Sequence, residues 1–127
     1  MNLYESNYIR FRRLVGNVEM LSDVSSSEVH NEAPLVLSVI ERAPYTTIAN
    51  MTYVFSDEKD ICKDPNLILR IYHDARLVEA ESCNDLPRHP VLRDLKIDAA
   101  SELARRWQRN ILLHKWLDYC VEQGHTL

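Results

Sequence analysis

The segment that decides the fold is Arg70-Ile71-Tyr72-His73-Asp74-Ala75-Arg76-Leu77-Val78-Glu79. It places four charged residues, a Tyr and a His within ten positions that otherwise have the pattern of a strand, a turn and a second strand. Strand interiors exclude charged side chains unless one face of the sheet is in water or the charges are paired. The segment is therefore predicted to be either a binding site or a hairpin with internally paired charges.

The strands of this hairpin are predicted over residues 67–73 and 76–83, and a two-residue loop at Asp74-Ala75 sets their register. The cross-strand pairs that follow from this loop are His73 with Arg76, Tyr72 with Leu77, Ile71 with Val78, and Arg70 with Glu79. One face of the hairpin is then apolar and contains Leu69, Ile71, Val78 and Ala80. A three-residue loop would instead shift the register by one residue and turn one strand over.

The charged face of the hairpin has two interpretations. In the first, Arg70 and Glu79 form a structural ion pair worth about 0.2–1 kcal/mol, and Asp74 accepts a hydrogen bond within the turn. In the second, the face is a small polar site in which Arg70 binds an anion and Glu79 is its partner or base. The candidate binding residues of this second interpretation are Arg70, Tyr72, His73, Asp74 and Glu79, together with Glu41 and Gln108.

Two further strands are predicted upstream of this hairpin. Residues 35–41 and 45–55 are rich in β-branched and aromatic residues, and Arg42-Ala43-Pro44 lies between them. Because proline is excluded from central strands, these two segments are predicted to form a hairpin that turns at Pro44. The polar segments 22–31 and 56–65 are predicted to be loops.

Helical patterns flank the four strands. Apolar residues recur every three or four positions from Tyr4 to Val15, after which Gly16 is predicted to end or kink the helix. A second helix is predicted from Ala99 to Gln123, where neither Pro nor Gly occurs. This order predicts one α+β domain over residues 1–127, with a four-stranded antiparallel sheet made of two hairpins and both helices packed on one face.

The last helix has an apolar arc wider than the ~100° that one contact with the core requires. Its two stripes are Leu103, Trp107, Ile111, His114, Leu117 and Val121, and beside them Leu112, Trp116, Tyr119 and Cys120. The helix is therefore predicted either to be sandwiched between the sheet and another element or to meet a protein partner or a second copy. The candidate interface residues are Leu112, Trp116 and Tyr119.

The composition excludes several classes of function. The net charge is −4, so nucleic-acid binding is not expected. Basic clusters such as Arg10-Phe11-Arg12-Arg13 fit the solvated face of a helix instead. Two glycines do not suffice for a glycine-rich phosphate-binding loop, and the five histidines have no metal-ligand spacing. Neither a metal nor a cofactor is predicted.

The chain carries no sign of export or membrane insertion. Three dispersed cysteines fit a reducing compartment, no signal peptide is visible, and no apolar stretch approaches the ~20 residues that span a bilayer. We expect a cytoplasmic protein.

Several short motifs resemble those of the YqiB-like family of small bacterial proteins of unknown function. The motifs are Asn7-Tyr8, Arg12-Arg13-Leu14, Tyr45-Thr46-Thr47, Tyr72-His73-Asp74-Ala75 and Trp116-Leu117-Asp118-Tyr119-Cys120 with Gly124. The chain departs from the family pattern at Arg88-His89-Pro90-Val91 and at Ala104-Arg105-Arg106. The resemblance implies a small bacterial protein and supplies no catalytic residues.

Two classes of function follow from these patterns. The first is a non-catalytic binding or regulatory module that forms a dimer or binds a protein through its last helix, since no catalytic motif is visible. The second is a nucleotide- or anion-binding domain, or an enzyme, built on the charged hairpin. The second class predicts that the candidate binding residues converge in one pocket.

Overall fold

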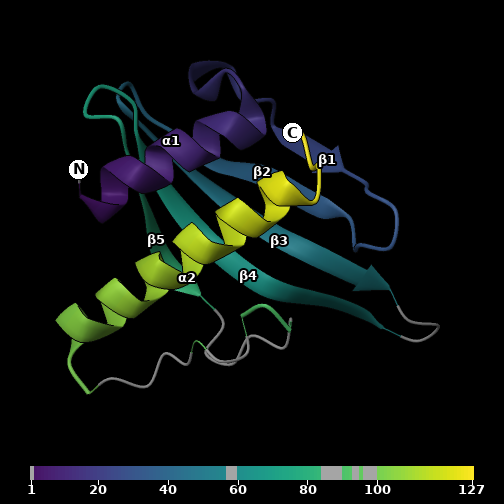
Figure 1. The fold of residues 1–127 in the computed structure, drawn as a ribbon. Helices are drawn as coiled ribbons and strands as arrows, with labels where there is room; N and C mark the ends of the chain where they lie inside the picture. Colours follow the sequence, from purple (N-terminus) through teal and green to yellow (C-terminus); the bar gives the residue numbers. More distant parts are fainter. Residues whose placement is uncertain (1, 57–59, 84–89, 93–94, 96–99) are drawn as a thin grey trace.

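The computed structural model describes residues 2–56, 60–83, 90–92, 95 and 100–127. A five-stranded antiparallel sheet with the order β1-β2-β3-β4-β5 is covered by two helices that pack together and against the sheet (Figure 1). The elements are α1 (Leu3–Val15), the short 3₁₀ helix η1 (Val18–Met20), β1 (Val24–Ser27), β2 (Leu35–Arg42), β3 (Thr46–Ser56), β4 (Ile61–Tyr72), β5 (Leu77–Cys83) and α2 (Glu102–Glu122). The predicted α+β class and antiparallel sheet are confirmed.

The prediction of four strands is wrong, because β1 forms within the segment predicted as a polar loop. This edge strand is held from far along the chain: the Ser27 hydroxyl lies 2.9 Å from Nδ1 of His125 and accepts a hydrogen bond of 3.1 Å from the Thr126 amide. A short serine-rich strand has no apolar alternation. Its partners near residue 125 lie too far along the chain to be predicted from the local sequence pattern.

The prediction of a loop over residues 56–65 is also wrong where the structure describes them, because β4 begins at Ile61 and runs through Pro65. The register shifts here, so that Thr52 pairs with Asn66 but Val54 pairs with Lys63. Such a bulge removes proline from the regular hydrogen-bond ladder, which is how a strand tolerates it. Residues 57–59 of the predicted loop lie outside the described residues.

The predicted register of the charged hairpin is confirmed at its three inner pairs, Tyr72 with Leu77, Ile71 with Val78, and Arg70 with Glu79. The pair of His73 with Arg76 is wrong, since residues 73–76 form the turn and Arg76 has a φ of 56°. The predicted apolar face is also confirmed, because Leu69, Ile71, Val78 and Ala80 are all buried.

Helix α2 packs against both the sheet and α1, and α1 lies beside it on the same sheet. The two helices run in the same direction, with Ser6 Oγ 3.3 Å from His114 Nε2 and Arg10 Nε 2.7 Å from Asp118 Oδ1. This arrangement explains the wide apolar arc. Leu112 and Trp116 are fully buried, so these two predicted interface residues belong to the core and offer no surface to a partner.

Tyr119, the third predicted interface residue, is only partly buried. It lines a groove of about 600 Å³ together with Phe55, and its hydroxyl donates a hydrogen bond to Glu32. Burial and the nearby Glu32 carboxylate raise the pKa of Tyr119 to about 12. The hydroxyl is therefore a donor at neutral pH.

The other apolar stripe of α2 is exposed at its N-terminal end. Because Ser6 lies beside His114, the first residue of α1, Leu3, is level with about residue 111, and the preceding turns of α2 extend past α1. Leu103 and Trp107 occupy these turns and are 79% and 54% exposed. The predicted arc is thus covered in one half and open in the other.

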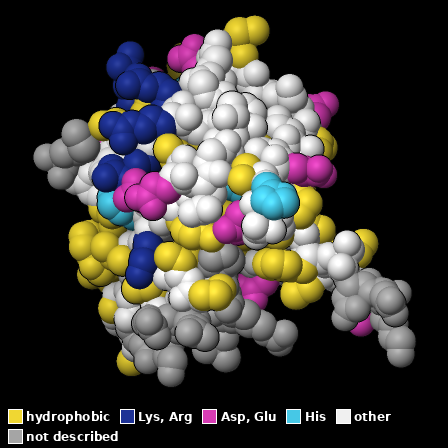
Figure 2. Space-filling model, turned by 45° about the vertical axis from the view of Figure 1, so that its right-hand side comes forward, with side chains coloured by type: hydrophobic (Ala, Val, Ile, Leu, Met, Phe, Trp, Pro, Cys, Tyr) yellow, Lys and Arg dark blue, Asp and Glu magenta, His cyan; other side chains and the backbone are white. Residues whose placement is uncertain are grey.

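Basic side chains gather along one edge of the molecule (Figure 2), and acidic side chains lie among them and elsewhere on the same face. In α1, Arg12 and Arg13 are exposed while Phe11 between the cluster's arginines is fully buried. The predicted solvated face is confirmed for these two arginines, whereas Arg10 of the same cluster is partly buried and pairs with Asp118. In the part of the chain that the structure describes, no helix is both long and apolar enough to cross a bilayer.

The contact between the C-terminus and β1 makes stability depend on pH. His125 is only 3% exposed, and burial lowers its pKa below the ordinary value of 6.5. The stability due to neutral His125 is therefore fully present above about pH 6.5 and is lost as the pH falls through the lowered pKa. We expect the free energy of unfolding, measured in urea, to decrease from pH 7 to pH 5 less steeply in His125→Gln than in the wild type. The exposed His30 provides the control variant His30→Gln, and an unchanged slope in His125→Gln would contradict this assignment.

Candidate functional site

A depression of about 400 Å³ lies where the N-terminal turns of α2 meet β4 and β5, and we call it the charged depression. Six of its seven described lining residues are charged. They are Arg70, Tyr72, Glu79 and Glu81 from the two strands, and Glu102, Arg106 and Arg109 from α2. Arg106 follows Glu102 by four positions, and Arg109 follows Arg106 by three. This spacing brings the three side chains to one side of the helix.

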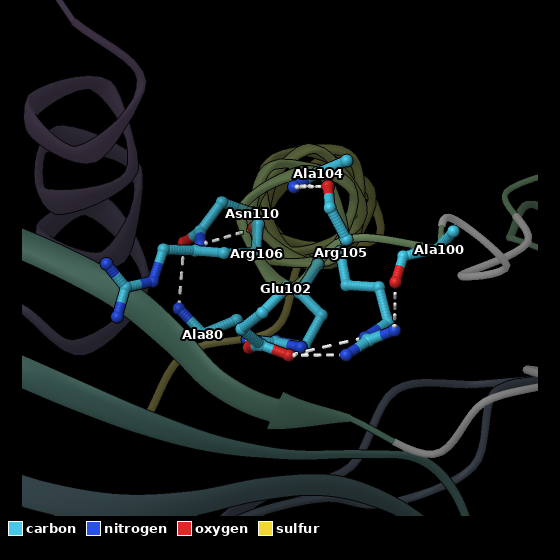
Figure 3. A network of polar contacts seen from close by, with 9 residues as sticks. Ala80, Ala100, Glu102, Ala104, Arg105, Arg106 and Asn110 are labelled. Atoms are coloured by element: carbon cyan, nitrogen blue, oxygen red, sulfur yellow. Dashed lines mark hydrogen bonds and ion pairs between the residues drawn. The ribbon is translucent and has the colours of Figure 1, made fainter.

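Asn110 positions the helix beside the edge of the sheet (Figure 3). Its side-chain oxygen accepts a 2.8 Å hydrogen bond from the Ala80 amide, and its side-chain nitrogen donates one of 2.9 Å to the Arg106 carbonyl. The amide of an edge strand would otherwise lack a partner. Because Asn110 is fully buried, this contact anchors α2 next to β5 and directs the side chains one turn earlier toward the depression.

Two arginines of the depression are held by carboxylates. Arg70 Nη2 lies 2.8 Å from Glu81, and Arg109 Nη2 lies 2.8 Å from Glu102, which also binds Arg105. Hydrogen bonds from Arg109 and Arg105 lower the pKa of Glu102. These pairs hold the guanidinium groups in defined positions.

Two charged residues of the depression remain, Arg106 and Glu79. Arg106 forms no side-chain hydrogen bond or ion pair with any residue that the structure describes. Glu79 accepts a 2.9 Å hydrogen bond from the Tyr72 hydroxyl. Burial, followed by this hydrogen bond, raises the pKa of Tyr72, so the hydroxyl stays protonated.

The seven predicted binding residues do not converge in one pocket. Arg70, Tyr72 and Glu79 line the charged depression, but the predicted ion pair of Arg70 with Glu79 is replaced by one with Glu81. Glu41 lies in the same row of the sheet as Arg70 and is separated from it by Ile48 of β3.

The other predicted binding residues line separate hollows. Gln108 lies beside Trp107 on another side of α2. His73 and Asp74 line a hollow at the tips of the two hairpins, where Nε2 of His73 is 2.7 Å from the Thr47 hydroxyl. Asp74 accepts a 2.9 Å hydrogen bond from the Ala75 amide, which is the turn role predicted in the structural interpretation.

Four lining residues, Glu81, Glu102, Arg106 and Arg109, were absent from the sequence prediction. The available signal was the common helical face of the three that α2 supplies. That face becomes part of a site only when α2 lies beside β5. The hydrogen bond that places α2 there joins Ala80 and Asn110, which are 30 positions apart.

The family described as "Protein of unknown function (DUF1249)" matches residues 10–126, a span that includes the whole charged depression. The chain belongs to this family. The "Uncharacterized protein YqiB" of Escherichia coli K12 is 27% identical over 124 residues, which cover 98% of this chain and 87% of the relative. The protein of that name from strain O157:H7 matches to the same extent. No solved structure matches the chain significantly.

This membership confirms the resemblance that the motifs predicted. The family is one of unknown function and assigns no activity to the residues of the charged depression.

Proposed function

We propose that this protein is a non-catalytic binding module that holds an acidic group of its ligand in the charged depression. The observation that carries the proposal is Arg106, whose guanidinium lines the depression without a carboxylate partner among the described residues. A guanidinium presents five donors in a fork that matches a carboxylate or a phosphate.

The neighbouring ion pairs support this proposal because they prepare the site in advance. Arg109 is held by Glu102, and its side chain is only 13% exposed. A ligand therefore pays little conformational entropy to order this side chain.

We expect Arg106→Gln to weaken binding of an acidic probe at least about ten-fold, since a hydrogen bond to a charged group contributes about 1.5–3 kcal/mol. The probes are inorganic phosphate and acetate, and NMR titrations follow the arginine Nε–Hε signals of ¹⁵N-labelled protein. Arg13→Gln, at an exposed arginine of α1, is the matched control and is expected to leave binding unchanged. Equal losses in both variants, or no binding by the wild type, would contradict the proposal.

A second candidate function is self-association, which the exposed end of α2 favours. Leu103 and Trp107 project beside a hollow of about 450 Å³ that the small residues Ser101 and Ala104 help to line. A surface with both projecting and small residues is complementary to a second copy of itself across a twofold axis. All described lining residues are uncharged, so like charges do not oppose the pairing.

We expect the wild type to have the mass of two copies in size-exclusion chromatography with light scattering. Trp107→Glu is expected to raise the dissociation constant at least about a hundred-fold, because each dimer would lose two buried tryptophans. Tyr45→Glu, at an aromatic residue that is 67% exposed in the β2–β3 turn, is the control. A wild type that stays monomeric at high micromolar concentration would contradict self-association.

A further inference from the structure

We infer that the ligand of the charged depression is a small zwitterion, which carries an ammonium group as well as its acidic group. The inference rests on the proposed function and names the class of ligand. It follows from the way charge is divided between the two walls of the depression. The sheet wall has one Arg and two Glu, for a net charge of −1, and the helix wall has two Arg and one Glu, for a net charge of +1.

The sheet wall has one excess negative charge because Arg70 is shared by two carboxylates. Arg70 Nη2 lies 2.8 Å from the Glu81 carboxylate, and the guanidinium also interacts electrostatically with Glu79, its neighbour across the strands. Glu79 keeps one neutral hydrogen bond, from the Tyr72 hydroxyl to Oε1. Since Tyr72 orients this carboxylate without neutralising it, Glu79 can accept hydrogen bonds from an ammonium group.

The excess positive charge of the helix wall belongs to Arg106. The other two charged groups of that wall, Glu102 and Arg109, are paired with each other at 2.8 Å, and Glu102 also binds Arg105, so no carboxylate of this wall is left for Arg106. No ion pair joins Arg106 and Glu79, although both line the same depression. A cation without an ion pair among the described residues and a carboxylate that shares Arg70 with Glu81 thus line the same depression from different walls.

A ligand of a single charge satisfies only half of this arrangement. A simple anion would bind Arg106 but would be repelled by the Glu79 carboxylate. A simple cation would bind Glu79 but would be repelled by the Arg106 guanidinium. A zwitterion places each of its charges beside the opposite charge of the protein. The volume of about 400 Å³ suits a molecule of amino-acid size.

The experiment compares matched probes that differ in one charged group. Glycine, 4-aminobutyrate and 6-aminohexanoate carry both charges at increasing separation, and acetate, butyrate and hexanoate lack the ammonium group. Butylamine lacks the carboxylate. Binding of each probe is measured by NMR titration of ¹⁵N-labelled wild type, Glu79→Gln, Arg106→Gln and the exposed control Glu28→Gln.

We expect at least one amino acid of the series to bind about ten-fold more tightly than its matched carboxylate in the wild type and in Glu28→Gln. Glu79→Gln is expected to abolish this difference while it leaves carboxylate binding intact. Arg106→Gln is expected to weaken both kinds of probe. This pattern assigns the ammonium group to Glu79 and the acidic group to Arg106.

Other outcomes separate the two proposals. If carboxylates bind as tightly as amino acids in the wild type, the zwitterion is excluded and the proposed acidic-group site stands. If no carboxylate or amino acid shifts the arginine Nε–Hε signals, the proposed function itself fails. If butylamine binds as tightly as 4-aminobutyrate, the cation alone carries binding and both proposals are overturned.

Discussion

Trp116→Ala is expected to lower the free energy of unfolding by about 3–5 kcal/mol, because it leaves a cavity in the centre of the core. Trp116 is fully buried and packs edge-to-face on Tyr53, with ring centroids 5.5 Å apart at an interplanar angle of 77°. Trp116 belongs to a core cluster whose side chains come from the sheet and both helices, so the cavity cannot close by the movement of one loop. Urea denaturation followed by circular dichroism measures the change.

Two variants separate the cavity from other effects of changing Trp116. Trp116→Phe retains an aromatic ring and removes an indole N–H that has no partner among the described residues, so we expect a smaller loss than for alanine. Tyr45→Ala, at an exposed aromatic residue, is expected to change stability by less than about 0.5 kcal/mol. A loss below about 1 kcal/mol in Trp116→Ala would show that this side chain is not in the core.

Asn110→Leu is expected to lower the free energy of unfolding by about 2–3 kcal/mol, although leucine is similar in size and more apolar. The buried Ala80 amide would lose its 2.8 Å acceptor, and the Arg106 carbonyl would lose a donor. An unsatisfied buried polar group costs about 1–3 kcal/mol. Urea denaturation again gives the magnitude.

Hydrogen exchange distinguishes this loss from general loosening of the core. In Asn110→Leu the Ala80 amide is expected to exchange much faster than in the wild type, while the Ile71 amide, inside the paired part of β4, keeps its protection relative to global unfolding. Equal acceleration at both amides would contradict a specific role of Asn110 at the edge of the sheet. The same variant also tests whether the charged depression depends on this anchor, because Arg106 lies one turn away.

The sequence predicted the parts of the fold that depend on local pattern. The alternation around Ile71 and Val78 sets the register and the buried face of the hairpin, and the stop signal at Gly16 is confirmed by its φ of 75° at the end of α1. The class of fold followed from the order of these elements. Each of these features depends on residues within about a dozen positions of one another.

The features that the sequence did not predict depend on distant contacts. Strand β1 is held by residues near 125, and the charged depression requires α2 to lie beside β5. The partner of Arg70 was predicted as Glu79, whereas a shift in register between Ile68 and Leu69 leaves the extra residue Glu81 next to it. A bulge changes which residues are neighbours across the two strands without changing the strand propensity of the segment. The periodicity of the sequence therefore cannot reveal it.

The contact between the C-terminal residues and the first strand bears on when this protein can fold during its synthesis. Ser27 and His125 are 98 positions apart, and α1 contacts α2 across 108 positions. A nascent chain that has passed the second hairpin still lacks the helix and the tail that cover its sheet. The part of the apolar face that α2 covers therefore stays open until α2 has left the ribosome, and β1 gains its contacts with His125 and Thr126 later still.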